Sequence, residues 1–161
     1  MLIFVVANAV SAIPAGLLGD DAFYNRLRKP PGSPPDWAYP PVWFVLNVTS
    51  LIALWLVANC GAAGERLAGT RTAFLWSEAA GWIAFAAFTG LFFGLRSPAL
   101  GAADTLAGLL IAAFSAACVW RLVPACGWWP FWLILPRAGW LAWAGYVSAA
   151  VAWLNRGGPP V

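Results

Sequence analysis

Residues 23–43 read FYNRLRKPPGSPPDWAYPPVW, a stretch that lies between two hydrophobic segments and holds six prolines, five aromatic residues and three cations in 21 positions. Proline fixes φ and restrains the residue before it, so the pairs Pro30–Pro31 and Pro34–Pro35 exclude a helix or a central strand here. A flexible surface linker would instead hold glycine, serine and charge, with few rings. The stretch therefore predicts a stiff, ring-lined loop that covers something flat and apolar.

The composition of the chain is that of a membrane protein. Hydrophobic residues make up 62% of its 161 residues and charged residues only 9%, and the mean hydropathy is +0.76. A soluble domain carries about 25% charged residues, so this chain has too little polar surface to coat a water-soluble globule. We expect a multi-pass integral membrane protein whose surroundings are the lipid bilayer, built as a single domain over residues 1–161.

Charged residues divide the chain into apolar segments of about 20 residues, the length that a spanning helix needs. The fold class predicted from this spacing is an all-α bundle of five transmembrane helices, with the first loop at residues 19–39. The helices are expected near residues 1–18, 40–60, 72–95, 98–120 and 128–154. The first segment has a second interpretation as a signal peptide, but it begins without Lys or Arg and the chain beyond it is itself apolar.

Lys and Arg are distributed unevenly between the two ends of the predicted bundle. The first-loop end has five of them: Arg26, Arg28, Lys29, Arg96 and Arg156. The other end has three: Arg66, Arg71 and Arg121. The positive-inside rule then places the first loop in the cytoplasm and the N-terminus outside.

Several classes of site are excluded or unsupported by the residue types present. The chain has no histidine, which excludes haem held by an axial histidine, and its three cysteines (Cys60, Cys118 and Cys126) show no metal-binding spacing. From three cysteines so placed, neither a disulfide framework nor a zinc site follows. We expect no metal, no obligatory cofactor and no nucleic-acid partner.

Glu78 and Arg137 are ionisable residues placed inside predicted spans. Counted from the second-loop end at 1.5 Å per residue, their depths differ by only about 6 Å. Unpaired charge at such a depth is costly, so a structural Glu78–Arg137 ion pair is one interpretation. The other is that Arg137 binds the carboxylate of a ligand.

Asp104, near the start of the fourth predicted helix, also has two interpretations. It pairs with Arg26, Arg28 or Lys29 and so holds the first loop down, or it caps the helix start, where a carboxylate suits the helix dipole.

Small and aromatic residues inside the spans leave further alternatives open. Gly90 and Gly94 form a GxxxG motif, which lets helices approach closely in lipid, either within one bundle or between the copies of a homodimer. Trp43 and Trp140 lie within spans beside proline or glycine. They either pack in the core or line a ligand cavity.

The loop motif resembles that of the translocator protein family, also called tryptophan-rich sensory proteins (TspO/MBR). The family pattern W-Y-x-x-L-x-K-P-x-x-x-P-P-x-W-x-F-P-x-x-W is matched at Tyr24, Leu27, Lys29, Pro30, Pro34, Pro35, Trp37, Pro40 and Trp43. Residues 91–98 are similar to the FFG-x-[KR]-x-P junction of the family, and residues 135–140 to its P-Y-x-x-W block. The resemblance covers nearly the whole chain and indicates a divergent, bacterial-type member.

The chain departs from the family at positions that face the expected cavity. Arg137 stands where the family usually has tyrosine, Asn47 also replaces a tyrosine, and Ser148 replaces an asparagine. Gly81 and Phe85 stand in place of Gln and Asn. Phe88 replaces a tryptophan. Because these changes remove or move polar groups, the ligand is expected to be altered.

The resemblance implies a bundle, commonly dimeric, that binds a tetrapyrrole such as protoporphyrin IX beneath the first loop and acts as a receptor or sensor. The alternatives are transport of porphyrin-like or other hydrophobic molecules, and light-dependent porphyrin breakdown at the candidate catalytic residues Trp43 and Trp140; a receptor is favoured over an enzyme. The expected ligand-binding residues are Phe23, Tyr24, Trp37, Pro40, Trp43, Asn47, Phe85, Phe88, Arg137, Trp140 and Ser148. Sterol binding is not expected, because no Lys or Arg follows Tyr146 within five residues.

Overall fold

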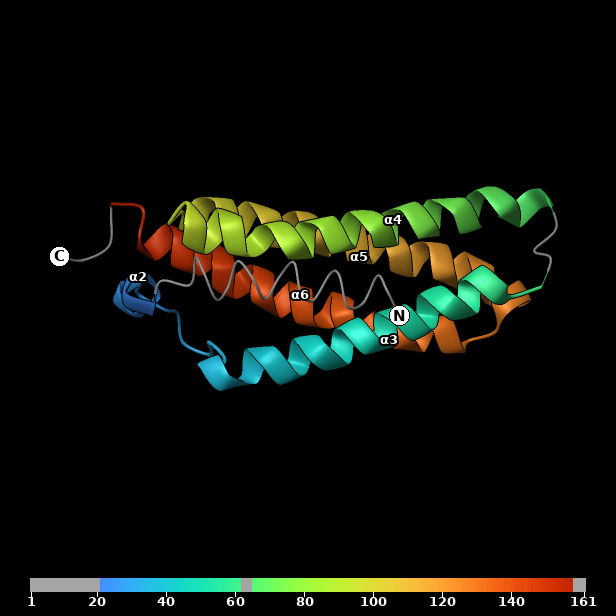
Figure 1. The fold of residues 1–161 in the computed structure, drawn as a ribbon, viewed down its shortest axis with the longest axis horizontal. Helices are drawn as coiled ribbons and strands as arrows, with labels where there is room; N and C mark the ends of the chain where they lie inside the picture. Colours follow the sequence, from blue (N-terminus) through green and yellow to red (C-terminus); the bar gives the residue numbers. More distant parts are fainter. Residues whose placement is uncertain (1–20, 62–64, 158–161) are drawn as a thin grey trace.

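The computed structural model describes residues 21–61 and 65–157, and every regular element within these ranges is a helix (Figure 1). The elements are α2 (Asp21–Arg26), the 3-10 helix η1 (Asp36–Ala38), α3 (Tyr39–Asn59), α4 (Glu65–Thr89), the π-helix η2 (Gly90–Gly94), α5 (Pro98–Cys126) and α6 (Trp129–Leu154). The first predicted helix, residues 1–18, lies outside the described residues. The all-α class is confirmed.

The four long helices lie side by side along the long axis of the molecule (Figure 1). Helix α5 packs against both α4 and α6, whereas α3 packs mainly on α6. Short helix α2 lies beside the end of α6, and the chain then turns into the start of α3 (Figure 1). The first loop therefore meets the bundle where α3 begins and α6 ends.

Three of the four long helices begin at or next to a proline. Proline occupies the first turn of α3, α5 and α6, where its missing N–H costs nothing because that group has no partner within the helix. Ser97 caps α5, its hydroxyl accepting a hydrogen bond from the Leu100 N–H at 3.3 Å. Gly127, with a φ of +72°, follows the end of α5 and donates its N–H to the Val123 carbonyl at 2.8 Å.

Two of the predicted helix boundaries are wrong. Helix α4 begins at Glu65 instead of residue 72, and α5 continues to Cys126 instead of ending at residue 120. Charge spacing locates the part of a helix that lipid surrounds. The helix itself continues beyond that part, since the backbone hydrogen bonds continue, and charged or polar residues occupy its ends.

The end of the bundle far from the first loop holds a buried apolar cluster, here called the dry core. Its members come from all four long helices: Ala53, Val57, Phe74, Cys118, Val119, Leu122 and Ile134. Of these, Phe74, Leu122 and Ile134 are fully buried. Burial of this kind is worth about 1.5–3 kcal/mol for each large side chain.

A disulfide joins Cys60, just after α3, to Cys126, the last residue of α5, with a Cα–Cα distance of 5.2 Å. The number and spacing of the cysteines had given no indication of this bond. Spacing along the chain could not show this pair, since 66 positions separate the two residues. They meet because α3 and α5 end at the same side of the bundle, whereas Cys118 is a free, buried thiol.

Three of the described helices are long and apolar enough to cross a membrane, within the ranges Asp36–Asn59, Leu67–Gly94 and Pro98–Cys126. Large hydrophobic side chains on their outer faces are exposed, among them Phe44, Trp55, Ile83 and Leu110. An outer surface of this kind suits lipid and would be unfavourable in water. Both observations support the prediction of a membrane bundle.

Candidate functional site

A band of polar side chains, here called the polar tier, lies directly on the dry core. Ser50, Glu78 and Arg137 each stand one helical turn closer to the first loop than a member of the dry core. The corresponding core residues are Ala53, Phe74 and Ile134. Residues three or four apart share a helix face, so α3, α4 and α6 bring these polar groups to one level. Ser77 of α4 and Ser115 of α5 complete the tier.

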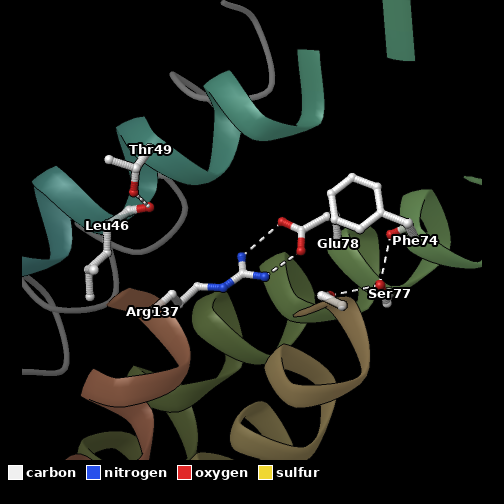
Figure 2. A network of polar contacts seen from close by, with 7 residues as sticks. Leu46, Thr49, Phe74, Ser77, Glu78 and Arg137 are labelled. Atoms are coloured by element: carbon white, nitrogen blue, oxygen red, sulfur yellow. Dashed lines mark hydrogen bonds and ion pairs between the residues drawn. The ribbon is translucent and has the colours of Figure 1, made fainter. Parts of the chain in front are cut away.

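An ion pair between Arg137 and Glu78 is the main contact of the polar tier (Figure 2). Arg137 Nη1 donates to Glu78 Oε2 at 2.9 Å, and Nη2 donates to Oε1 of the same carboxylate. The two residues are 7% and 1% exposed. The predicted structural pair is confirmed. Both terminal nitrogens of Arg137 are thus already engaged, and the charge of its guanidinium is neutralised within the protein.

Four buried donors near this level have no hydrogen-bond partner among the residues that the structure describes. They are Ser50 Oγ, Trp82 Nε1, Arg137 Nε and Trp140 Nε1. The other serines of the tier differ, because Ser77 and Ser115 bond to each other at 2.8 Å and Ser77 also donates to the Phe74 carbonyl. Buried polar groups normally find partners, so the four exceptions call for an explanation.

Aromatic rings fill the space between the polar tier and the first loop, and are here called the aromatic tier. Its members are Tyr39, Trp43, Phe85 and Trp140. The Trp43 and Phe85 ring centroids lie 4.9 Å apart, and those of Tyr39 and Trp140 lie 5.9 Å apart, edge to face. These four side chains are only partly buried. Of the predicted ligand-binding residues, Trp43 and Phe85 therefore contact each other, and Trp140 contacts Tyr39, which lies one turn before Trp43 on α3.

The first loop is held closed by contacts within itself. The Tyr24 hydroxyl donates to Asp36 Oδ1 at 2.9 Å, and Lys29 Nζ lies 3.4 Å from the same oxygen. Lys29 Nζ also lies 3.5 Å from the centroid of the Tyr24 ring. Burial, and then the hydrogen bond to Asp36, raise the pKa of Tyr24 above its usual value.

The loop is fixed to the bundle by Asn155, which follows α6. Asn155 Oδ1 accepts from the Arg28 N–H at 3.1 Å, and Nδ2 donates to the Arg28 carbonyl at 3.0 Å. The same Nδ2 donates to the Val151 carbonyl. Neither Asn155 nor Asp36 was predicted to have a role in the site. A polar residue at the end of a long apolar helix was the available signal for Asn155.

Neither interpretation of Asp104 is correct. Among the described residues, Asp104 forms no ion pair with the loop, and Lys29 pairs with Asp36 instead. The cap of α5 is Ser97, with Asp104 more than one turn further along the helix. Arg26 and Arg28 are exposed on the loop.

A second aromatic cluster attaches α2 to the π-helix. Phe92 contacts Phe23 and Phe88, with ring centroids 5.7 and 5.4 Å away, and Tyr24 lies 6.1 Å from Phe93. Phe23, Tyr24 and Phe88 were predicted to bind a ligand, and the structure places them in this cluster.

Glycine permits a close approach in the same cluster. A Cβ at Gly101 would lie 2.4 Å from Phe92, whereas Gly90 has no such neighbour and Gly94 is exposed on the π-helix. The tight contact within the chain thus involves a glycine outside the GxxxG motif. A homodimer through Gly90 and Gly94 stays a prediction.

The remaining predicted ligand residues lie apart from one another. Trp37 is 76% exposed, and Pro40 is exposed as well. Asn47 is buried on α3, one turn from Trp43. Ser148 faces α5, where its hydroxyl lies 3.3 Å from Thr105 Oγ1. In this arrangement Trp37 and Ser148 are not part of the aromatic tier.

Comparison with known proteins gives a consistent result over the whole chain. The model of the TspO/MBR family matches residues 1–154. Protein CrtK of Rhodobacter capsulatus is 29% identical over 159 residues, 99% of this chain and 94% of that protein. The tryptophan-rich sensory protein of Cereibacter sphaeroides is 30% identical over 131 residues, 79% of this chain and 73% of that protein. The translocator protein homolog of Schizosaccharomyces pombe is 30% identical over 134 residues, 82% and 77% of the two chains.

Proposed function

Because the chain belongs to the TspO/MBR family, we propose that it is a membrane receptor that binds a tetrapyrrole such as protoporphyrin IX between its first loop and its polar tier. The match spans residues 1–154 and so includes the loop and both tiers. In this proposal, the bound ligand reports or regulates the tetrapyrrole level of the cell.

The observation that carries the proposal is the aromatic tier beneath the closed loop. Trp43, Phe85, Tyr39 and Trp140 supply four rings, only partly buried, from three different helices. A porphyrin macrocycle is flat and apolar, and stacking on such rings is worth about 0.5–1.5 kcal/mol beyond the burial of area. The rings contact one another at tilted or edge-to-face angles, which a flat ligand inserted between them would replace with face-on contacts.

The cations of the loop are suited to the acidic groups of such a ligand. Arg26 and Arg28 are exposed, and the contacts that Arg28 makes with Asn155 use its backbone and not its guanidinium. Charge-assisted hydrogen bonds from arginine to a carboxylate are among the strongest that proteins make. In this proposal the propionates of a porphyrin lie at the loop and the macrocycle lies on the aromatic tier.

The test is a titration of the detergent-solubilised protein with protoporphyrin IX, followed by tryptophan quenching and by the porphyrin absorption band. Saturable binding is expected in the parent protein. Trp43→Leu should weaken it about two- to tenfold, because a ring stack of about 0.5–1.5 kcal/mol is lost. Trp132→Phe is the matched control, since Trp132 is exposed at the opposite end of the bundle. Equal affinities in the two variants would contradict the proposed site.

Two other readouts separate this receptor role from transport and from chemistry. A transporter would move the porphyrin across the bilayer of proteoliposomes. A photo-oxidative role at Trp43 and Trp140 would give a new pigment when the complex is illuminated, beyond the bleaching of free porphyrin. Saturable binding with neither effect is the outcome expected of a receptor.

A further inference from the structure

The polar tier contains two buried donors from facing helices that have no acceptor among the described residues. Ser50 of α3 is 1% exposed and Arg137 of α6 is 7% exposed, and both stand one turn above neighbouring members of the dry core. Arg137 meets Glu78 end-on through its two Nη atoms, so its Nε does not point along that contact. Figure 2 shows Arg137 reaching from α6 toward Glu78 of α4.

The charge of the tier is already balanced, and this restricts what can bind there. Glu78 neutralises Arg137 within the protein, as Figure 2 shows. A ligand carboxylate at the same level would make two anions share one guanidinium in a medium of low dielectric, which is unfavourable. A neutral oxygen acceptor would satisfy the remaining donors without adding charge.

We propose that the polar tier receives a neutral hydrogen-bond acceptor, a carbonyl or ester oxygen, at the end of the ligand that lies deepest in the bundle. Ser50 Oγ and Arg137 Nε are its donors. This inference rests on the proposed function, because the same ligand occupies the aromatic tier above. It adds a specificity for uncharged groups at the polar tier. Of two ligands with the same macrocycle, the one that presents an uncharged oxygen to the tier should bind there more tightly than the one that presents a carboxylate.

The first experiment uses Ser50→Ala with Ser115→Ala as the matched control, since both hydroxyls are buried in the same tier. Ser115 is bonded to Ser77 at 2.8 Å, whereas Ser50 has no described partner. Removing an unsatisfied buried hydroxyl removes a penalty. Ser50→Ala should therefore raise the unfolding midpoint of the ligand-free protein by about 2–4 °C. Ser115→Ala should lower it.

The same two variants are then titrated with protoporphyrin IX dimethyl ester. A porphyrin carries both propionates on one edge. In the diacid this edge is held at the loop, whereas the uncharged edge of the dimethyl ester is free to turn toward the polar tier. Ser50→Ala should weaken binding about two- to tenfold, the value of one hydrogen bond. Ser115→Ala should weaken it less, because the Ser115 hydroxyl is already bonded to Ser77. A gain in stability together with a loss of affinity is a pair of effects that a structural serine does not give. If Ser50→Ala lowers stability, or leaves the affinity unchanged, the inference is wrong.

The second experiment compares protoporphyrin IX with its dimethyl ester in the parent protein and in Glu78→Gln. This variant leaves Arg137 with an unbalanced positive charge. The affinity ratio should then shift toward the diacid by about tenfold or more. Lys29→Gln is the control for propionates held at the loop, and it should shift the ratio toward the ester. An unchanged ratio in a folded Glu78→Gln protein would overturn the inference.

The outcomes separate the two proposals. If the parent binds neither macrocycle, the proposed function fails and the inference fails with it. If the parent binds both macrocycles but responds to neither Ser50→Ala nor Glu78→Gln, the proposed function stands and only the neutral acceptor site is rejected.

Discussion

The half of the bundle beyond the Glu78–Arg137 pair and the half beneath the first loop are formed by the same four long helices but differ in how they are filled. Beyond the pair, Phe74, Leu122 and Ile134 are fully buried and a disulfide joins α3 to α5. Toward the loop, partly buried rings meet at tilted or edge-to-face angles, and four buried donors have no acceptor among the described residues. From this difference we expect the far half to supply most of the stability and the half beneath the loop to supply the proposed binding, with the ion pair as the boundary.

The largest expected effect comes from breaking that boundary. Arg137→Met leaves the Glu78 carboxylate buried and unpaired, and should cost about 3–5 kcal/mol of unfolding free energy. The double variant Arg137→Met, Glu78→Leu removes both charges and should recover most of this loss. Chemical denaturation in detergent measures both values. A double variant as unstable as the single one would mean that packing by Arg137, and not its charge, maintains the boundary.

Removing the disulfide tests whether the half of the bundle far from the first loop contributes to stability but not to ligand binding. Replacing Cys60 and Cys126 by alanine should lower the unfolding free energy by about 2–4 kcal/mol, because the unfolded chain regains freedom. Affinity for protoporphyrin IX should stay the same, since the bond lies at the end opposite the aromatic tier. Reduction of the parent protein by a thiol is the companion measurement. A change in affinity without a change in stability would mean that the far half contributes to binding, which would contradict this division between the halves.

Replacing Asn155 tests the half of the bundle beneath the first loop. Asn155→Ala removes both hydrogen bonds to the Arg28 backbone and should cost about 1–3 kcal/mol, most of it in loop closure. Tryptic cleavage after Arg26 and Arg28 should accelerate as the loop opens. Asn59→Ala serves as the control, because that amide bonds only its own helix at the far end. Equal cleavage rates in the two variants would show that the loop is closed by other contacts.

The smallest effect concerns pH. The pKa of Tyr24 is raised above 10 by burial and by its hydrogen bond to Asp36. A raised pKa means that the neutral phenol stabilises the closed loop, so this contribution is complete below pH 10 and is lost as the pH rises through the value of the folded state. Tryptic cleavage of the loop should speed up in strongly alkaline solution for the parent, and Tyr24→Phe should lack this dependence.

Charge spacing and helix depth predicted much of this arrangement. Both the all-α class and the Glu78–Arg137 pair follow from rules that act along a single helix, namely the length of an apolar segment and the rise per residue. The Cys60–Cys126 disulfide and the Asn155–Arg28 contact depend on which helix ends meet, and that is not visible in spacing. Asp104 shows the same limit, since a nearer partner, Asp36, engages Lys29.

Some of the residues predicted to bind a ligand lie beside one another in the structure, and others lie apart. Trp43 contacts Phe85 of α4, and Trp140 contacts Tyr39 of α3, because these rings lie on helix faces that point toward a neighbouring helix. Trp37 belongs to the same loop motif, yet η1 leaves it exposed. Ser148 lies on α6 like Trp140, but it faces α5. Motif position alone does not give the direction of a side chain.

The Cys60–Cys126 disulfide also bears on which end of the bundle faces the cytoplasm. Disulfides form and persist in oxidising compartments and are rare where thiols are kept reduced. The end that carries this bond is then expected to face away from the cytoplasm, and the first loop, at the opposite end, is expected to face it. This is the orientation that the distribution of Lys and Arg also predicts. A ligand admitted under that loop would be drawn from the cell's own metabolism rather than from its surroundings.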